Sequence, residues 1–246
     1  MILLEQISKS YAGGKVKAVS GLDMRVKPGE IFGFIGPNGA GKTTTIKMIT
    51  GVLRPDEGRV VIDGIDMGQD PIGAKGRIGY VPDSHDAYDR LTGTEYLDFI
   101  GSVYGVPLEE RRARAETYLN LFELAGAAGD LVRSYSHGMK QKLLLTGALL
   151  HDPPLLLLDE PMVGLDPKAA LLLKQEMRAR CDRGRTVFFS THVLEVAEKL
   201  CDRIGIIYGG KLIAVGTLAE LRSGDAGASL EAMFFELTER GGRDAG

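Results

Sequence analysis

The chain has 246 residues, with 30 basic and 33 acidic side chains, a net charge of -3 and 44% hydrophobic residues, which is enough for a buried core. The acidic balance provides no general field for nucleic acid, and the two cysteines, Cys181 and Cys201, are too few for a disulfide framework or a paired zinc site, so we expect a reduced, intracellular protein without a nucleic-acid partner. No stretch approaches the roughly 20 apolar residues of a membrane span, and residues 1–10 lack the features of a secretory signal, so we expect a chain that is soluble by itself.

Short apolar runs rich in β-branched residues alternate with helical stretches along the chain, which predicts an α/β fold. Residues 155–158 are apolar at consecutive positions, as in strands covered on both faces, so the central sheet is expected to be mostly parallel. Gly209 and Gly210 separate two short runs and predict an antiparallel hairpin over residues 204–215. The other predicted strands are 31–35, 58–62, 78–81, 155–159 and 186–190.

The sequence GPNGAGKTT follows the predicted strand 31–35 and precedes a helical run that ends near Gly51. It fits the phosphate-loop pattern G-x-x-x-x-G-K-[ST], and this strand-to-helix context argues against a chance glycine-rich turn. Backbone N–H groups of such a loop surround phosphates, its lysine reaches the β- and γ-phosphates, and its threonine hydroxyl binds Mg²⁺. The predicted ATP-binding residues are Gly36, Pro37, Asn38, Gly39, Ala40, Gly41, Lys42, Thr43 and Thr44.

Between about residues 91 and 150 the strand pattern disappears, and residues 94–104 and 109–124 carry apolar side chains at helical spacing. We therefore expect a helical subdomain inserted into the α/β core. The expected division is a core with the phosphate loop over 1–90, the helical subdomain over 91–152, the continued core over 153–222, and a C-terminal helix with a flexible tail over 223–246.

A second motif follows the helical part, where the apolar run 155–158 ends in Asp159 and Glu160 comes next. A carboxylate at this end of a strand can hold Mg²⁺ through water, and the next carboxylate can orient and deprotonate the attacking water. Taken alone, the segment could also be a buried strand followed by a solvated acidic pair. Together with the phosphate loop it predicts an ATPase with ATP and Mg²⁺ as cofactors, Asp159 and Thr43 on the metal and Glu160 as the general base.

Residues 134–141, SYSHGMKQ, resemble the signature segment of ABC (ATP-binding cassette) ATPases, and the resemblance extends over residues 2–221. It implies an ABC-type phosphate-loop fold in which Tyr11 stacks on adenine. It also implies that Asp83 begins the glutamine loop of the family and that Asp166 belongs to its dimer-contact loop. His192 is similar to the switch histidine of the family, which can donate to the γ-phosphate and orient the water.

Ser136 can cap a helix that starts near Gly138, which would leave backbone N–H groups and a positive helix dipole aimed at an anion. A plain helix cap that serves only its own fold is the alternative for this short pattern. In the family two domains pair head to tail, so the resemblance implies that Ser136 and Gly138 act in trans on ATP held by a second ABC ATPase domain, with a homodimer expected.

Three positions depart from the commonest form of the family: Asp83 replaces glutamine, His137 replaces the first signature glycine, and Val163 replaces serine. Asp83 places a carboxylate near Mg²⁺ and the attacking water, where it either binds the metal through water or only crowds Glu160 with like charge, and we expect a role on the Mg²⁺ side and in coupling. His137 keeps a backbone N–H and adds bulk. With these features the chain resembles bacterial ABC subunits of the Ecs-type branch.

The resemblance implies an ATP-hydrolysing motor subunit of a transporter, peripheral on the cytoplasmic face of the cell membrane, that works with a separate integral-membrane subunit, with export expected. One alternative is a soluble ABC ATPase that acts on nucleic acid or ribosomes, which the acidic charge and the single cassette disfavour. Another is a regulatory subunit that binds ATP without turnover, which the presence of Lys42, Asp159, Glu160 and His192 disfavours.

Overall fold

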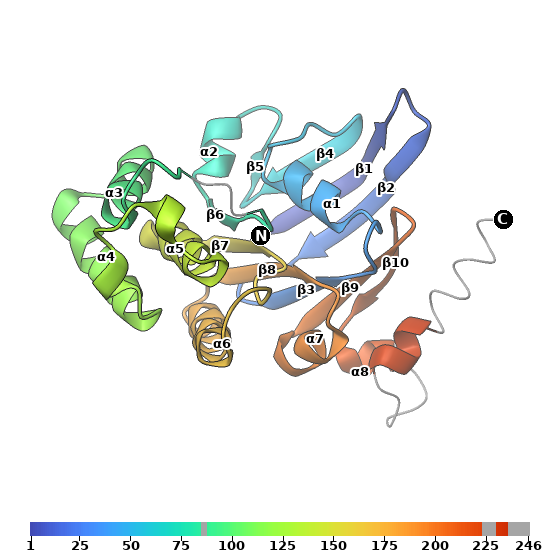
Figure 1. The fold of residues 1–246 in the computed structure, drawn as a ribbon. Coiled ribbons are helices and arrows are strands. Elements are labelled where there is room, and N and C mark those ends of the chain that lie inside the picture. The colour runs from blue at the N-terminus through green and yellow to red at the C-terminus, as the bar shows by residue number, and fades with distance from the viewer. Residues whose placement is uncertain (85–87, 223–229, 236–246) are drawn as a thin grey trace.

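The strands among the described residues form two sheets, one of six strands and one of four. The structure is a computed structural model, and it describes residues 1–84, 88–222 and 230–235. Helices between residues 93 and 150 gather at the end of the molecule opposite the four-stranded sheet (Figure 1).

The six-stranded sheet has the order β10, β9, β3, β8, β7, β6. Neighbouring strands are parallel from β9 to β6, and β10 pairs with β9 as an antiparallel hairpin. The expectation of a mostly parallel central sheet that ends in an antiparallel hairpin is therefore confirmed. The strand bounds are β3 Ile31–Ile35, β6 Ile78–Val81, β7 Leu155–Asp159, β8 Thr186–Thr191, β9 Arg203–Tyr208 and β10 Lys211–Gly216.

The four-stranded sheet is antiparallel and has the order β2, β1, β4, β5. The sequence pattern predicted β4 as a strand but did not predict β1 and β2, because one face of this ribbon carries charged and polar side chains that break up the apolar runs. The bounds are β1 Ile2–Tyr11, β2 Val16–Val26, β4 Glu57–Ile62 and β5 Ile65–Asp66.

Helix α1, Lys42–Ile49, lies between the two sheets (Figure 1). Its buried side chains pack in one cluster with residues of both sheets, including Leu155 and Leu157 of β7. The alternate residues Leu156 and Leu158 belong to a second cluster, on the side of the helices that follow β6. Both faces of β7 are covered, which explains why its residues are apolar at every position.

The chain forms helices between β6 and β7. The two predicted helices are present, and the second ends earlier than expected because Glu123, with φ +57°, leaves the helical conformation. A capping box of Thr92 and Glu95 begins the first of them. The bounds are α3 Gly93–Val103, α4 Leu108–Leu121, α5 His137–Leu150, and the short 3₁₀ helices η1 Ala125–Ala127 and η2 Val132–Ser134.

Arginine side chains join the helical part to the core where the chain returns to β7. Arg180 of α6, Pro167–Asp182, is fully buried, and its Nη1 lies 3.1 Å from Asp152 Oδ1 while Nη2 donates to Pro153 O over 2.5 Å. Arg114 of α4 donates to Leu150 O over 3.0 Å. Side chains of α4 and α6 thus hold residues 150–153, where the chain leaves α5.

Three short helices complete the described elements: α2 Pro71–Lys75, α7 Leu194–Leu200 and α8 Leu218–Leu221. Residues 230–235 are also helical, and Leu230 and Met233 pack with Ile204 and Ile206 of β9. The expected flexible tail lies outside the described residues. None of the described helices combines the length and the apolar character that a membrane crossing needs.

Candidate functional site

The phosphate loop connects β3 to α1, and its lysine is held inside it. Lys42 is buried, and its Nζ donates to Gly36 O over 2.7 Å and to Pro37 O over 3.3 Å. The N-cap of α1, Gly41, has φ +109°, and a Cβ there would overlap Ala18 O of β2. Glycine is therefore required at position 41 both by the backbone angle and by the close approach of another strand.

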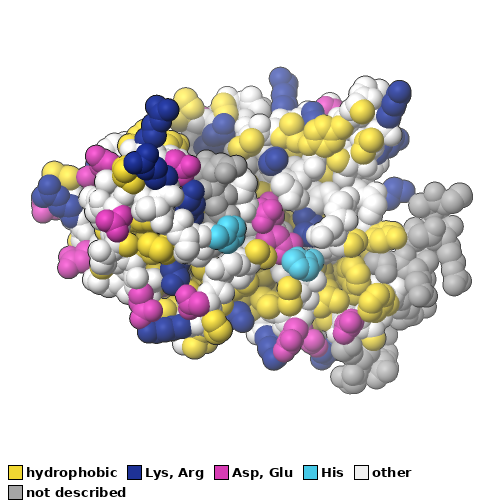
Figure 2. Space-filling model, viewed as in Figure 1, with side chains coloured by type: hydrophobic (Ala, Val, Ile, Leu, Met, Phe, Trp, Pro, Cys, Tyr) yellow, Lys and Arg dark blue, Asp and Glu magenta, His cyan; other side chains and the backbone are white. Residues whose placement is uncertain are grey.

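A hollow of about 210 Å³ lies over this loop. The first N–H groups of α1 receive no side-chain cap at Gly41, so they can bind an anion in the hollow, as helix N-termini do. Figure 2 shows acidic side chains and two histidines close together at the middle of one face of the molecule. The residues that line the hollow are Ala18, Pro37, Asn38, Gly39, Gly41, Lys42, Thr43, Thr44, Asp83 and Glu160.

Asp159, the last residue of β7, is a buried carboxylate beside the loop. Its Oδ1 accepts a hydrogen bond from Ser190 Oγ over 2.5 Å, whereas the buried Oδ2 makes no well-directed hydrogen bond with any described residue. Burial raises the pKa of Asp159, hydrogen bonds from Ser190 and Thr43 lower it, and the charges of Asp83 and Glu160 raise it further.

A buried carboxylate oxygen without a well-directed hydrogen bond suits a cation or its bound water, and Thr43 supplies a hydroxyl next to it. Within the described ranges no three His, Cys, Asp or Glu side chains form a metal cluster by themselves. This agrees with the way Mg²⁺ is usually bound, through one or two carboxylates with the remaining positions filled by waters and substrate phosphates. The residues present therefore fit Mg²⁺.

Glu160 sits in an unusual backbone conformation at the point where three polar groups meet. Its φ is +49°, and its N–H donates to Ser190 Oγ over 3.0 Å. His192 Nδ1 lies 3.0 Å from Glu160 Oε2, and Lys42 Nζ lies 3.5 Å from Oε1. Non-glycine residues with positive φ are uncommon and cluster at active sites. The carboxylate is oriented by two neighbours and can accept a proton from water in the hollow.

Of the other predicted site residues, Asp83 lines the hollow, whereas Tyr11 and the signature residues do not. Asp83, just after β6, lines the hollow. Its charge raises the pKa of Asp159, which places it within electrostatic reach of that carboxylate. Tyr11 ends β1 and is 42% exposed, but it does not line the hollow. The expected adenine contact of Tyr11 therefore stays a prediction.

The signature residues also lie outside the lining of the hollow. Ser136 is the N-cap of α5 and its Oγ accepts the N–H of Met139 over 3.3 Å, as the cap pattern predicted. Asp166 caps α6, and its Oδ2 accepts a hydrogen bond from Lys142 Nζ of α5 over 2.7 Å. The expected contact of Ser136 and Gly138 with ATP in trans therefore stays a prediction.

Two residues of the site were not singled out from the sequence. Ser190 bridges Asp159 and Glu160, and Ala18 forms a wall of the hollow. Ser190 is the penultimate residue of β8, and it is paired in register with Asp159 across the sheet. The signal that could have found it is a polar residue at the carboxyl end of a strand adjacent to β7, which requires knowledge of the strand order.

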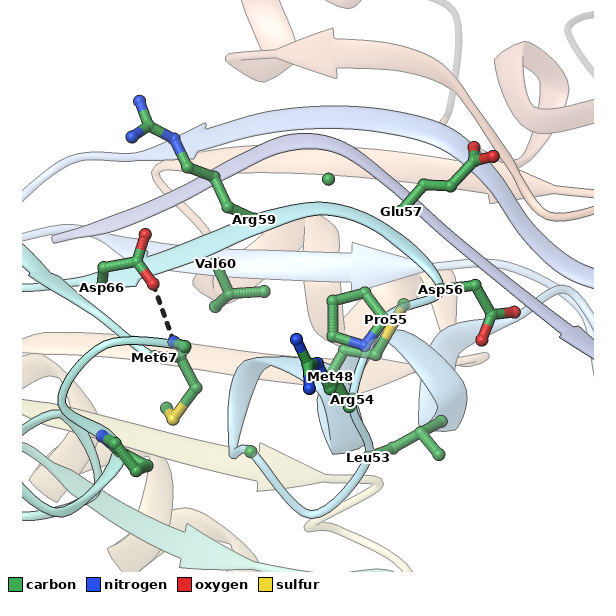
Figure 3. A pocket seen from close by; sticks show the side chains of 14 residues that line it. Met48, Leu53, Arg54, Pro55, Asp56, Glu57, Arg59, Val60, Asp66 and Met67 are labelled. Atoms are coloured by element: carbon green, nitrogen blue, oxygen red, sulfur yellow. Dashed lines mark hydrogen bonds between the residues drawn. The ribbon is translucent and has the colours of Figure 1, made fainter.

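A larger cavity of about 550 Å³ lies away from the phosphate loop, between the end of α1 and the strands β4 and β5 (Figure 3). Its lining includes Met48 and Val60, and two of its three acids are already bound: Asp66 accepts from the Gly68 N–H, and Asp56 pairs with Lys9. This cavity collects no set of convergent polar groups, so the smaller hollow is the better candidate for chemistry.

Comparison with known proteins agrees with this geometry. The sequence profile of the family described as ABC transporter matches residues 19–163. The linearmycin resistance ATP-binding protein LnrL of Bacillus subtilis (strain 168) is 41% identical over 223 residues, which is 91% of this chain and 71% of that protein. The ABC-type transporter ATP-binding protein EcsA of the same organism is 35% identical over 242 residues, 97% of each chain. An Ecs protein is thus among the relatives, while LnrL shares more identical residues.

Solved structures give the same result. The ATP-binding subunit of an ABC transporter superposes with a TM-score of 0.92 at 34% identity, covering 97% of this chain and 99% of that one. A dimeric ATP-binding cassette in a post-hydrolysis state, bound to ADP and Pi, superposes with a TM-score of 0.80 at 29% identity, covering 89% of this chain and 99% of the other.

Proposed function

The chain belongs to the ABC transporter family, and we propose that it is the ATP-hydrolysing motor subunit of a transporter whose membrane-spanning part is a separate polypeptide. As a member of this family it is an ATP-binding ABC ATPase. The observation that carries the proposal is that Lys42 and Glu160 line one hollow at the N-terminus of α1, with His192 Nδ1 3.0 Å from the Glu160 carboxylate.

In this proposal the ATP phosphates lie over the loop, where the N–H groups of α1 and the ammonium of Lys42 bind them. Thr43 and Asp159 would hold Mg²⁺, with Asp83 contributing through water, and the metal would neutralise phosphate charge. Glu160 accepts the proton of the attacking water. His192, 3.0 Å from Glu160, fixes the direction of that carboxylate and can donate to the γ-phosphate.

We propose that two copies of the chain pair head to tail. Ser136 caps α5, and the positive end of that helix dipole attracts anions, which supports a contact with ATP of the other copy in trans by Ser136 and Gly138. Asp166 would lie at the same interface, and Tyr11 would stack on adenine. A related cassette that is dimeric with ADP and Pi supports the pairing. ATP then favours the closed dimer because it contacts both chains only in that state.

The transport role rests on the relatives. One of them is named for linearmycin resistance and others for daunorubicin resistance, which supports export as the direction. We propose that the subunit is bound at the cytoplasmic face of the cell membrane through its integral-membrane partner, and that the partner selects the substrate.

The variant Glu160→Gln tests both parts of the proposal. It removes the proton acceptor and keeps the shape, so ATP turnover should be lost while ATP with Mg²⁺ drives the chain into a dimer, measured by size-exclusion chromatography. Pull-down of the tagged variant from membranes should recover an integral-membrane protein. Arg112→Ala, at a well-exposed position of α4, is the matched control and should keep turnover. A variant that hydrolyses ATP normally, or stays monomeric without a membrane partner, would contradict the proposal.

The metal-side role of Asp83 has its own test. Asp83→Asn and Asp83→Gln keep a polar side chain in the hollow but remove the charge near Asp159. We expect both variants to need more Mg²⁺ for half-maximal ATPase rate. An unchanged Mg²⁺ dependence in both would show that Asp83 takes no part in binding the metal.

A further inference from the structure

The imidazole of His137 packs against Gly164, in the loop that follows Glu160. A Cβ on Gly164 would overlap His137 Cδ2 and would lie 2.7 Å from Nε2. Gly164 has φ +80°, so its backbone also favours glycine. The ring of His137 thus occupies the space where any other residue at position 164 would carry its side chain.

Further contacts join the same two segments along the first turns of α5. The backbones approach closely at Gly138, where an added Cβ would lie 2.7 Å from Gly164 O. The buried side chain of Gln141 donates to Pro161 O over 3.2 Å, and Lys142 pairs with Asp166. The loop 161–166 is therefore attached to α5 at its start, middle and end.

Glu160 lies immediately before this loop and has the positive φ described above. A strained backbone persists only where its surroundings determine it. On the other side the Glu160 N–H is held by Ser190, and after Glu160 the chain is held by α5. The position of the carboxylate therefore depends on the packing between α5 and residues 161–166.

We propose that His137 is a positioning residue for Glu160, and that its ring does this by filling the space over Gly164. The inference rests on the proposed catalytic role of Glu160. It assigns a task to the residue that replaces the first signature glycine: the helix that would contact ATP of the other copy is packed onto the loop that orients the general base of its own chain.

This role predicts a change in turnover without a change in nucleotide binding. His137→Ala removes the ring but leaves the phosphate loop intact, so the affinity of the monomer for ATP, measured by titration with a fluorescent ATP analogue, should stay within about twofold. The kcat should fall about 10-fold to 100-fold, the effect of a small misplacement of a catalytic group. His137→Phe restores a ring of similar shape and should recover most of the kcat.

A double-mutant cycle isolates the contact. Gly164→Ala should lower kcat in the native background because its methyl group meets the ring of His137. In the His137→Ala background the same substitution keeps the backbone cost at φ +80° but loses the overlap, so its further effect on kcat should be several-fold smaller. Arg112→Ala serves as the surface control, and thermal melting of each variant shows whether it is folded.

The outcomes separate the two proposals. If Glu160→Gln retains turnover, the proposed function fails regardless of the cycle. If Glu160→Gln is inactive and the effects of His137→Ala and Gly164→Ala simply multiply, the positioning role is wrong. It is also wrong if folded His137→Ala keeps its kcat, if His137→Phe is as slow as His137→Ala, or if ATP affinity falls as much as kcat does.

Discussion

The hydroxyl of Ser190 donates to Asp159 Oδ1 over 2.5 Å, and Ser190 Oγ also accepts a hydrogen bond from the backbone N–H of Glu160 over 3.0 Å. One side chain of β8 thus fixes both carboxylate residues that follow each other at the end of β7. The register of the two strands, which places Asp159 opposite Ser190, makes this possible.

Ser190→Ala should lower the stability of the chain and weaken its use of Mg²⁺, because the hydroxyl that binds Asp159 and Glu160 is lost. Each lost partner in a buried hydrogen bond costs about 1–3 kcal/mol, so we expect the free energy of unfolding to fall by about 2 kcal/mol or more in urea titrations. The Mg²⁺ concentration for half-maximal ATPase rate should rise. Ser102→Ala, which removes two exposed hydrogen bonds far from the hollow, to Asp98 O and from Arg111 Nη1, is the control and should keep the native Mg²⁺ dependence. Equal Mg²⁺ dependence in the two variants would contradict the role of Ser190.

Asp159→Asn should have opposite effects on stability and on activity. Burial raises the pKa of Asp159, so the native state binds its proton more tightly than the unfolded state does, and the ionised carboxylate lowers stability as pH rises through the raised pKa. The nucleotide-free variant should therefore melt higher than the native chain near pH 8, with the difference shrinking toward pH 4. ATP with Mg²⁺ should raise the melting temperature of the native chain more than that of the variant. A variant that melts lower at pH 8 would contradict this account.

His151 should make the stability of the chain depend on pH with a sign opposite to that of Asp159. Burial lowers the pKa of His151 to about 4, so the native state binds fewer protons than the unfolded state between pH 6.5 and about 4, and stability is lost as pH falls through that window. The full difference corresponds to roughly 3 kcal/mol.

His151→Phe keeps a ring for the stack on Tyr104, where the ring centroids lie 3.6 Å apart. The variant should match the native chain in urea unfolding at pH 8 and should be more stable than it at pH 5. Parallel stability curves over the whole range would show that His151 does not titrate in this way.

Arg180 should be more sensitive to truncation than its exposed neighbour. Its guanidinium is fully buried and binds Asp152 and Pro153 O, so Arg180→Ala leaves an unfilled buried space and removes the donor from Pro153 O, which should cost about 2–5 kcal/mol. Arg185 also pairs with Asp152 but is 38% exposed, and Arg185→Ala should cost about 1 kcal/mol or less. Urea unfolding of the two variants makes the comparison, and equal losses would contradict it.

The sequence was informative where the chemistry lies in consecutive residues. The phosphate loop and the pair Asp159 and Glu160 are local patterns that follow apolar strands, and the structure brings Lys42 and Glu160 within 3.5 Å. The parallel sheet was predictable because strands covered on both faces are apolar throughout, as β7 is.

Ser190 and Ala18 could not be predicted as site residues from a local sequence motif. Ser190 reaches the site through the strand order, and Ala18 reaches it because the four-stranded sheet packs over α1. Both arrangements depend on contacts between residues far apart in the chain. The strand containing Ala18 was itself missed, since its alternating pattern is interrupted by charged residues and by Gly21, with φ +55°.

The phosphate loop is completed by parts of the chain that are made at very different times. The N–H of Gly210 donates to Ala40 O over 3.0 Å, and Gly210 O accepts from the Ser20 N–H over 2.9 Å. The loop motif leaves the ribosome early, but the hydrogen bonds of Gly210 form only after the hairpin of β9 and β10 has been synthesised and folded. We therefore expect a nascent chain that stops before Gly210 to hold ATP poorly, so that nucleotide binding begins only after the hairpin of β9 and β10 has been made.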